Sequence, residues 1–198
     1  MLLCGSRRHF RGAMKAEQDR LRPDHKTALM VVDLQQALCD AAPSEPIQTV
    51  MTHIEELLQL AKLSGWPVVF VQHWTEPGSI LDRGSAGWQL AGALRDRVPD
   101  FHLEKNALSC FEDGRLHVWL NEKGITRLCI TGMQTEYCIS AACEGAAARG
   151  YDVILPVDAH MTIDGPDRSA AEIVAEANER LAGLAQCMQT ASICAAHA

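Results

Sequence analysis

The sequence predicts an α/β fold: a three-layer, Rossmann-like domain with a mostly parallel sheet of about six strands. Short, continuous apolar runs such as residues 27–33 (TALMVVD) are typical of strands buried on both faces of a parallel sheet. These runs alternate along the chain with stretches of helical periodicity. Such alternation favours βαβ units, whose crossovers are almost always right-handed.

The first βαβ unit covers residues 27–72. After the strand at 27–33, Ser44 and Pro46 begin a helix with an apolar stripe, which Gly65 ends. The second strand is predicted at 68–72. A long loop with two tryptophans follows at 73–88, and long loops at this edge of a sheet usually line sites.

The second half of the chain repeats the alternation. We expect a strand at 101–104, a helix around 116–120 that Gly124 ends, and a strand at 127–131. A helix at 139–149, a strand at 151–155, a helix opened by Pro166 and an edge strand at 191–194 complete the prediction.

Composition indicates an ordinary globular protein. The chain has 198 residues, 47% of them hydrophobic and 22% charged, which suits one domain with a substantial core. The net charge is −7, and the body of the chain carries no basic tract, so we expect no nucleic-acid partner. No apolar run approaches membrane-spanning length, so we expect no membrane partner either.

The eight cysteines include no CxxC pair, and the chain is not small. Reduced thiols in a cytoplasmic protein are therefore the better interpretation, and no paired-cysteine zinc framework is visible.

Residues 1–26 are expected to be a loosely ordered extension, and residues 27–198 a single domain. The first sixteen residues carry four basic side chains and no acid, as targeting peptides do, but they lack a signal peptide's continuous apolar core. A start at Met14 is the alternative interpretation.

Asp33, Lys105 and Cys138 each directly follow a predicted strand. If these strands are parallel neighbours, the three side chains converge on one crevice. An ammonium and a helix N-terminus favour a thiolate, and an aspartate can carry the thiol proton. A buried lysine also needs a carboxylate partner. Taken alone, Cys138 could equally be an inert, buried helix cysteine.

Four segments, in this order, carry a family resemblance: VVDLQ with Asp33, KNALSCF with Lys105, TGMQTEYC with Cys138, and GYDVILPVDAH with Asp158. Together they resemble the isochorismatase-like cysteine hydrolases, the superfamily that includes nicotinamidases and N-carbamoylsarcosine amidohydrolase. MQTEYC is most similar to the metal-free branch that includes streptothricin hydrolase.

The resemblance implies roles for particular residues. Cys138 would be the nucleophile, Asp33 the proton carrier and Lys105 the group that organises the site electrostatically. It also implies a cis peptide bond between Met133 and Gln134. The backbone N–H groups of Gln134 and Cys138 would then form an oxyanion hole.

Two departures from the family bear on metal and substrate. Nicotinamidases carry an Asp-x-His metal motif where this chain has Gln72-His73-Trp74, so we expect no catalytic metal and no cofactor. Isochorismatases proper cleave a vinyl ether without a nucleophilic cysteine, so Cys138 makes that reaction unexpected.

The expected partner is a small-molecule substrate, and the resemblance implies a homo-oligomer, a dimer or a tetramer. His73 could be a base, a metal ligand or a pocket wall, and the tryptophans could pack the loop or line the pocket. The expected substrate-binding residues are Gln35, Leu38, His73, Trp74, Trp88, Phe111 and Tyr137.

The leading hypothesis is a cysteine-dependent hydrolase that cleaves a C–N bond of a small amide, lactam or ureido compound through a thioester. One alternative is a thiol sensor or scaffold without catalysis, and another is a nicotinamidase-type amidase. A third is a cysteine–histidine hydrolase that uses His73 or His160.

Overall fold

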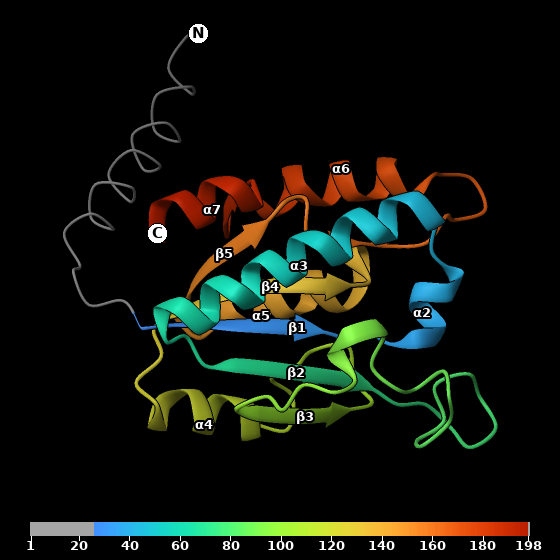
Figure 1. Ribbon diagram of the computed structural model, residues 1–198, viewed down its shortest axis with the longest axis horizontal. Coiled ribbons are helices and arrows are strands. Elements are labelled where there is room, and N and C mark those ends of the chain that lie inside the picture. The colour runs from blue at the N-terminus through green and yellow to red at the C-terminus, as the bar shows by residue number, and fades with distance from the viewer. Residues whose placement is uncertain (1–25, 198) are drawn as a thin grey trace, which may run out of the picture.

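The structure is a computed structural model that describes residues 26–197. The predicted extension at 1–26 therefore lies, apart from Lys26, outside the described residues. One parallel sheet runs through the molecule in the order β3-β2-β1-β4-β5-β7, and the short β6 pairs with β4 beside this path. Figure 1 labels β1 to β5 of this sheet. The strands are β1 (Thr27–Val32), β2 (Val68–His73), β3 (Phe101–Lys105), β4 (Arg127–Met133), β5 (Asp152–Pro156), β6 (His160–Met161) and β7 (Gln186–Met188).

Helices cover both faces of the sheet (Figure 1). They are α2 (Gln36–Ala41), α3 (Ser44–Ser64), α4 (Arg115–Glu122), α5 (Ser140–Ala148), α6 (Ala170–Leu181) and α7 (Thr190–His197), with a 3₁₀ turn η1 (Gly92–Leu94) and a π-helical turn η2 (Thr135–Ile139). The predicted three-layer α/β architecture is confirmed, with seven strands between residues 26 and 197 in place of about six.

The buried strand β1 shows why the apolar runs are continuous. All six of its residues are buried, and alternate side chains enter opposite cores. Met30 joins the core under α4 and α5, whereas Leu29 joins the core under α3 and α7. A strand covered on both faces has no solvent side on which to place polar residues.

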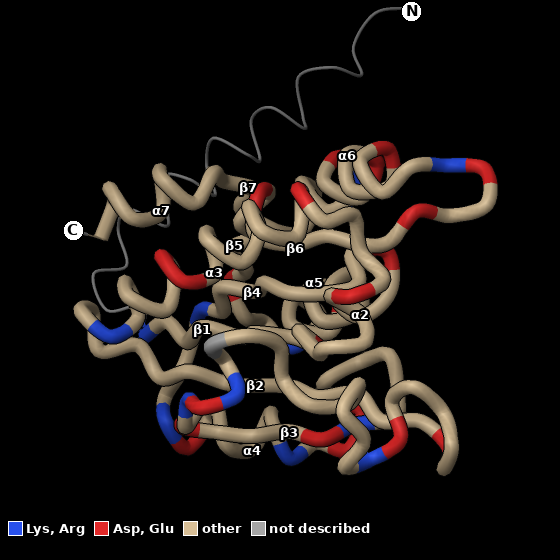
Figure 2. Tube along the Cα trace, turned by 45° about the vertical axis from the view of Figure 1, so that its right-hand side comes forward, with Lys and Arg blue, Asp and Glu red and all other residues tan. Residues whose placement is uncertain are grey.

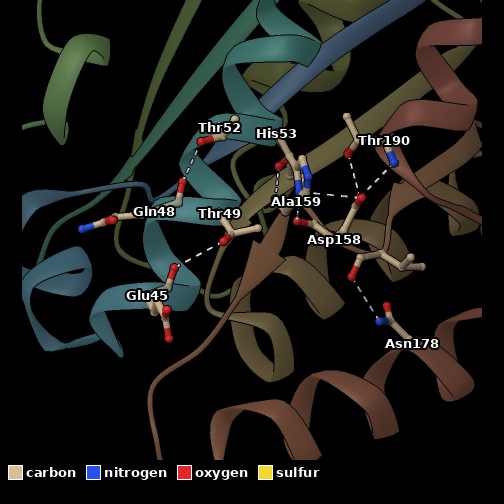
Figure 3. A network of polar contacts seen from close by, with 11 residues as sticks. Glu45, Gln48, Thr49, Thr52, His53, Asp158, Ala159, Asn178 and Thr190 are labelled. Carbon is tan, nitrogen blue, oxygen red and sulfur yellow. Dashed lines mark hydrogen bonds and ion pairs between the residues drawn. The ribbon is translucent and has the colours of Figure 1, made fainter.

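The C-terminal tail corrects the prediction. The strand expected at 191–194 is wrong, because that segment lies within α7, while the edge strand β7 lies earlier, at Gln186–Met188. The first residue of α7 is fixed by a distant side chain: the backbone N–H and the hydroxyl of Thr190 both donate to Asp158 Oδ1, at 2.9 and 2.6 Å. Figure 3 shows Thr190 bound to Asp158 in this way.

Three smaller differences concern element ends and short elements. The helix α6 begins at Ala170 rather than at Pro166, because Ser169 and Glu172 form a capping box at its N-terminus. The short elements α2 and β6 were not expected. Both depend on contacts with distant segments, such as the pairing of β6 with β4.

Two expectations about partners concern the surface. Among residues 26–197, no helix has both the length and the apolar character needed to cross a membrane. Along the same residues, basic and acidic positions of the chain alternate around β3 and α4 (Figure 2).

His160 lies on β6 and is 2% exposed. Its Nδ1 is 2.9 Å from the Thr135 hydroxyl, and its Nε2 is 3.0 Å from Asn178 Oδ1. Burial lowers the pKa of His160 to about 4, although the contacts with Asn178 and Asp158 oppose this effect. His160 is therefore neutral near pH 7.

Gly132 generates a prediction about stability. Its φ is +120°, and a Cβ at this position would lie 2.0 Å from the carbonyl oxygen of Val32 on the neighbouring strand β1. We expect Gly132→Ala to lower the free energy of unfolding by about 2–4 kcal/mol, because strain and overpacking add. Urea denaturation measures the change.

Gly150 is the matched control. Its φ is also positive, at +84°, but no heavy atom lies within 4 Å of the point that a Cβ would occupy. Gly150→Ala should therefore cost only about 1 kcal/mol. Equal losses in the two variants would contradict the steric explanation.

The buried His160 generates a second prediction. An unfolded histidine has a pKa of about 6.5, so below that pH the unfolded chain takes up a proton that the folded chain refuses until about pH 4. Stability should therefore fall as the pH drops from 6.5 to 4. Protonation of the unfolded chain at His160 lowers the free energy of unfolding by about 3 kcal/mol by pH 4. In urea denaturation between pH 7 and pH 4, the wild type should lose about this much more than His160→Gln. Parallel losses would contradict the assignment.

Candidate active site

Four adjacent strands each place one reactive group at the same edge of the sheet. Lys105 ends β3, His73 ends β2, Asp33 follows β1, and Cys138 follows β4 across a short turn. The strand order reverses between β1 and β4, and open α/β sheets form their crevices at such a point. The strands that carry Asp33, Lys105 and Cys138 were expected to be direct neighbours. This holds for β1 and β4 but not for β1 and β3, because β2 with His73 lies between them.

The ammonium of Lys105 is the centre of the cluster. Its Nζ donates to Asp33 Oδ2 at 2.7 Å and to Cys138 Sγ at 3.2 Å. It also lies 3.3 Å from His73 Nδ1 and 3.1 Å from the carbonyl oxygen of Ala107. The side chains of Lys105 and Asp33 are only 5% and 1% exposed, so the ion pair is buried. The structure thus brings together all three predicted catalytic residues.

Asp33 has a backbone that few side chains adopt, with φ at +50°. Its N–H donates to the carbonyl of Val71 on β2, and its carbonyl accepts from the N–H of Gln35. Of its carboxylate oxygens, Oδ2 accepts from Lys105, while Oδ1 is buried with no partner among the described residues. That second oxygen is free to accept a proton.

Cys138 lies in the Cys138 turn, which we define as residues 133–138. The peptide bond between Met133 and Gln134 is cis, at the position that the resemblance implies. Thr135–Ile139 then forms one π-helical turn that continues into α5. Cys138 therefore lies in the first turn of a helix, and it is 8% exposed.

The protonation states differ from the sequence expectation. Burial, followed by the nearby charge of Asp33, raises the pKa of Cys138 to about 12, although Lys105 opposes the rise. The ammonium, which favours a thiolate, is thus outweighed by burial and by Asp33, and the thiol is protonated near pH 7. Burial alone would lower the pKa of Lys105, but Asp33 and its neighbours outweigh this effect and raise it. Burial and Lys105 lower the pKa of His73.

The cluster contains a possible ligand set for a metal. Asp33, His73 and Cys138 each offer one ligand atom, and these atoms lie within 4.8 Å of one another. However, the ammonium of Lys105 already contacts all three side chains. A divalent ion among them would meet a positive charge within about one ligand distance, so this donor set fits an ammonium better than a metal.

Gln72 stands where nicotinamidases have the aspartate of their metal motif, and its side chain is bonded to other residues of this chain. The amide of Gln72 donates to the carbonyl of Trp88, and its oxygen lies 2.6 Å from His102 Nε2. A neutral amide at this position supplies no negative charge for a cation.

Two expected substrate-binding residues lie elsewhere. Gln35 is fully buried, and its amide binds the backbone of His73 and Trp88 at 2.8–2.9 Å, so it holds the loop after β2 in place. Phe111 is 1% exposed, packs in the core under α5 and stacks against Tyr151. Neither side chain is accessible at the surface, because Gln35 bonds the loop after β2 and Phe111 packs in the core.

Of the other five, His73 belongs to the Lys105 cluster and four lie nearer the surface. Tyr137, beside the nucleophile candidate, is 51% exposed. Leu38, Trp74 and Trp88 are partly buried. Trp74 also lines a cavity of about 270 Å³ that reaches Lys105.

Sequence reasoning missed Arg83 in this region. Its guanidinium lies 4.2 Å from the centre of the Trp74 ring and 2.8 Å from Glu104 Oε2, and it lines the same cavity. Arg83 is itself exposed, and nothing in the spacing of the loop sequence distinguishes it from an arginine that contacts only solvent.

His160 was named only as a possible base. Its two ring nitrogens are taken by Thr135 and Asn178, so it has no free nitrogen to accept a proton from Cys138.

Comparisons with known proteins identify relatives of this chain. The streptothricin hydrolase of Streptomyces noursei is 33% identical over 140 residues, which are 70% of this chain and 56% of that protein. The chain thus spans little more than half the length of that relative. The ureidoacrylate amidohydrolase of Pseudomonas savastanoi is 25% identical over 191 residues, covering 77% of each chain.

A crystal structure of an isochorismatase-family protein from Burkholderia xenovorans superposes with a TM-score of 0.80 at 28% identity, over 87% of each chain. The family model described as the isochorismatase domain matches residues 27–191, which include the whole Lys105 cluster. The chain therefore belongs to the isochorismatase family.

Proposed function

We propose that this protein is a cysteine hydrolase that cleaves a carbon–nitrogen bond of a small amide, lactam or ureido compound without a metal. One observation carries the proposal: a buried ammonium, that of Lys105, binds both a carboxylate and the sulfur of Cys138. The similarity to proteins named streptothricin hydrolase and ureidoacrylate amidohydrolase supports the reaction class.

The first half of the reaction forms a thioester. The sulfur of Cys138 attacks the carbonyl carbon while its proton passes to Asp33, whose Oδ1 is unpartnered among the described residues. The carbonyl oxygen takes the electron pair and is held by the N–H groups of Gln134 and Cys138. The carbon–nitrogen bond then breaks, and Asp33 returns the proton to the leaving nitrogen.

The second half releases the acid. Asp33 takes a proton from water as the water oxygen attacks the thioester carbon, and the departing sulfur recovers that proton. Throughout, the ammonium of Lys105 stabilises whichever neighbour is negative, the carboxylate or the sulfur. A protonated resting thiol fits this scheme, because proton transfer then accompanies attack.

The same protonation state disfavours the thiol-sensor alternative. Sensor cysteines react as accessible thiolates with a lowered pKa. Cys138 is buried and its pKa is raised to about 12, so the alternative lacks the property that it needs.

The nucleophile is tested by Cys138→Ala against a panel of small amides, lactams and ureido compounds. The variant should lose turnover to background, and intact-mass spectra should show an acyl adduct on the wild type but not on the variant. Cys143→Ala is the matched control, because Cys143 lies in the core on the same helix and should be dispensable. Full turnover in Cys138→Ala would overturn the proposal.

The proton carrier is tested by Asp33→Asn, which keeps the side chain's shape and removes its basicity. We expect kcat to fall about 10²–10⁴-fold with a folded protein. Circular dichroism at matched concentration controls for folding. A loss of less than threefold would rule out Asp33 as the proton carrier.

The buried ion pair gives a prediction about stability. Lys105→Met leaves Asp33 as an uncompensated buried charge and should lower the free energy of unfolding by about 3–5 kcal/mol. Adding Asp33→Asn to this variant removes the charge and should recover most of the loss, without recovering activity. Urea denaturation measures both, and additive losses would contradict the buried pair.

A further inference from the structure

The Cys138 turn is tied to β6 and α6 by contacts that the reaction scheme does not use. Strand β6 pairs with the end of β4, with Gly132 opposite His160 and Met133 opposite Met161. The carbonyl of Ala159 accepts from the N–H of Gly132 and from the hydroxyl of Thr131. These bonds hold the backbone just before the turn.

Within the turn, Thr135 is held at its carbonyl and at its hydroxyl. Its carbonyl accepts from the Ser140 hydroxyl at 2.7 Å, and Arg180 of α6 in turn donates to that hydroxyl at 2.6 Å. Its own hydroxyl lies 2.9 Å from His160 Nδ1. Thr135 is fully buried, so water cannot satisfy its polar groups and the loss of either bond would leave a buried group unpaired.

The direction of the bond to His160 follows from Asn178 on α6. The Asn178 Nδ2 donates to the carbonyl of Val157 at 3.4 Å, a contact drawn at Asn178 in Figure 3. Its Oδ1 therefore faces His160 Nε2, which must carry the ring proton. In the neutral ring Nδ1 is then an acceptor, and the Thr135 hydroxyl is its donor.

We propose that His160 is a positioning residue for hydrolysis, which acts on Cys138 through the Thr135 hydroxyl. The inference rests on the function proposed above. Among the described bonds, His160 touches none of the reacting groups, but it fixes Thr135, which lies within the Cys138 turn between the two proposed oxyanion donors, Gln134 and Cys138. Displacements of about 1 Å in such groups cost about a hundredfold in rate.

Two replacements of His160 separate its two bonds. In His160→Gln, the amide can reach Asn178 but places no acceptor at the position of Nδ1. In His160→Asn, the shorter amide places an acceptor there. We expect His160→Gln to lower kcat about 10- to 100-fold with KM changed less than threefold, and His160→Asn to recover part of that loss.

Thr135→Val removes the donor with little change in volume. It should lower kcat as much as His160→Gln does. The variant with both substitutions should lose no more kcat than the worse single variant, because the two changes break the same bond. His53→Gln is the control: His53 is also partly buried and hydrogen-bonded to the Asp158 carbonyl, but it lies on α3 and makes no contact with the turn among the described bonds. It should keep wild-type kcat.

Amide hydrogen exchange gives a readout that needs no substrate. Exchange across residues 133–142 should accelerate at least tenfold in His160→Gln and Thr135→Val, with the rest of the chain unchanged and with no acceleration in His53→Gln. Unchanged exchange in this segment, an increase of equal size over the whole chain, or additive losses in the double variant would overturn the inference. If the wild type turns over no substrate of the panel, the proposed function fails, while the exchange result still decides the role of His160.

Discussion

A buried positive charge organises this sheet edge. The ammonium of Lys105 is withdrawn from water, and transfer of such an ion into a protein costs several kcal/mol unless it is paired and hydrogen-bonded. Asp33, Cys138, His73 and the Ala107 carbonyl together provide those partners. Each comes from a different segment of the chain, so the ion is satisfied only when β1, β2, β3 and the Cys138 turn are all in place.

The same charge explains why the residues suit the proposed acyl transfer better than metal binding. Three ligand-type side chains converge, but the cation they share is an ammonium. Burial keeps the sulfur protonated, and the neighbouring carboxylate has an oxygen unpaired among residues 26–197. In a metal site the ion would hold the thiolate, whereas in the proposed reaction a proton moves between sulfur and carboxylate.

The support for the Cys138 turn lies on the other side of β4. The short strand β6 and the helix α6 meet the turn through His160, Asn178 and Arg180. None of these residues belongs to the reactive cluster. Two layers of polar contacts therefore converge on one helical turn, one reaching the sulfur and the other reaching the backbone that carries it.

The order of apolar and amphipathic segments in the sequence predicts the alternation of strands and helices, and with it the α/β class, because burial on both faces makes strand residues uniformly apolar. It also placed Asp33, Lys105 and Cys138 at or just beyond the ends of strands. Tertiary structure alone decided the order of those strands, which places His73 between Asp33 and Lys105. It also decided the protonation of Cys138, the inward packing of Gln35 and Phe111, and the helical tail. The physical reason is that periodicity reports which face of an element is covered, whereas pairing order, desolvation and hydrogen bonds between distant residues arise only when the elements meet.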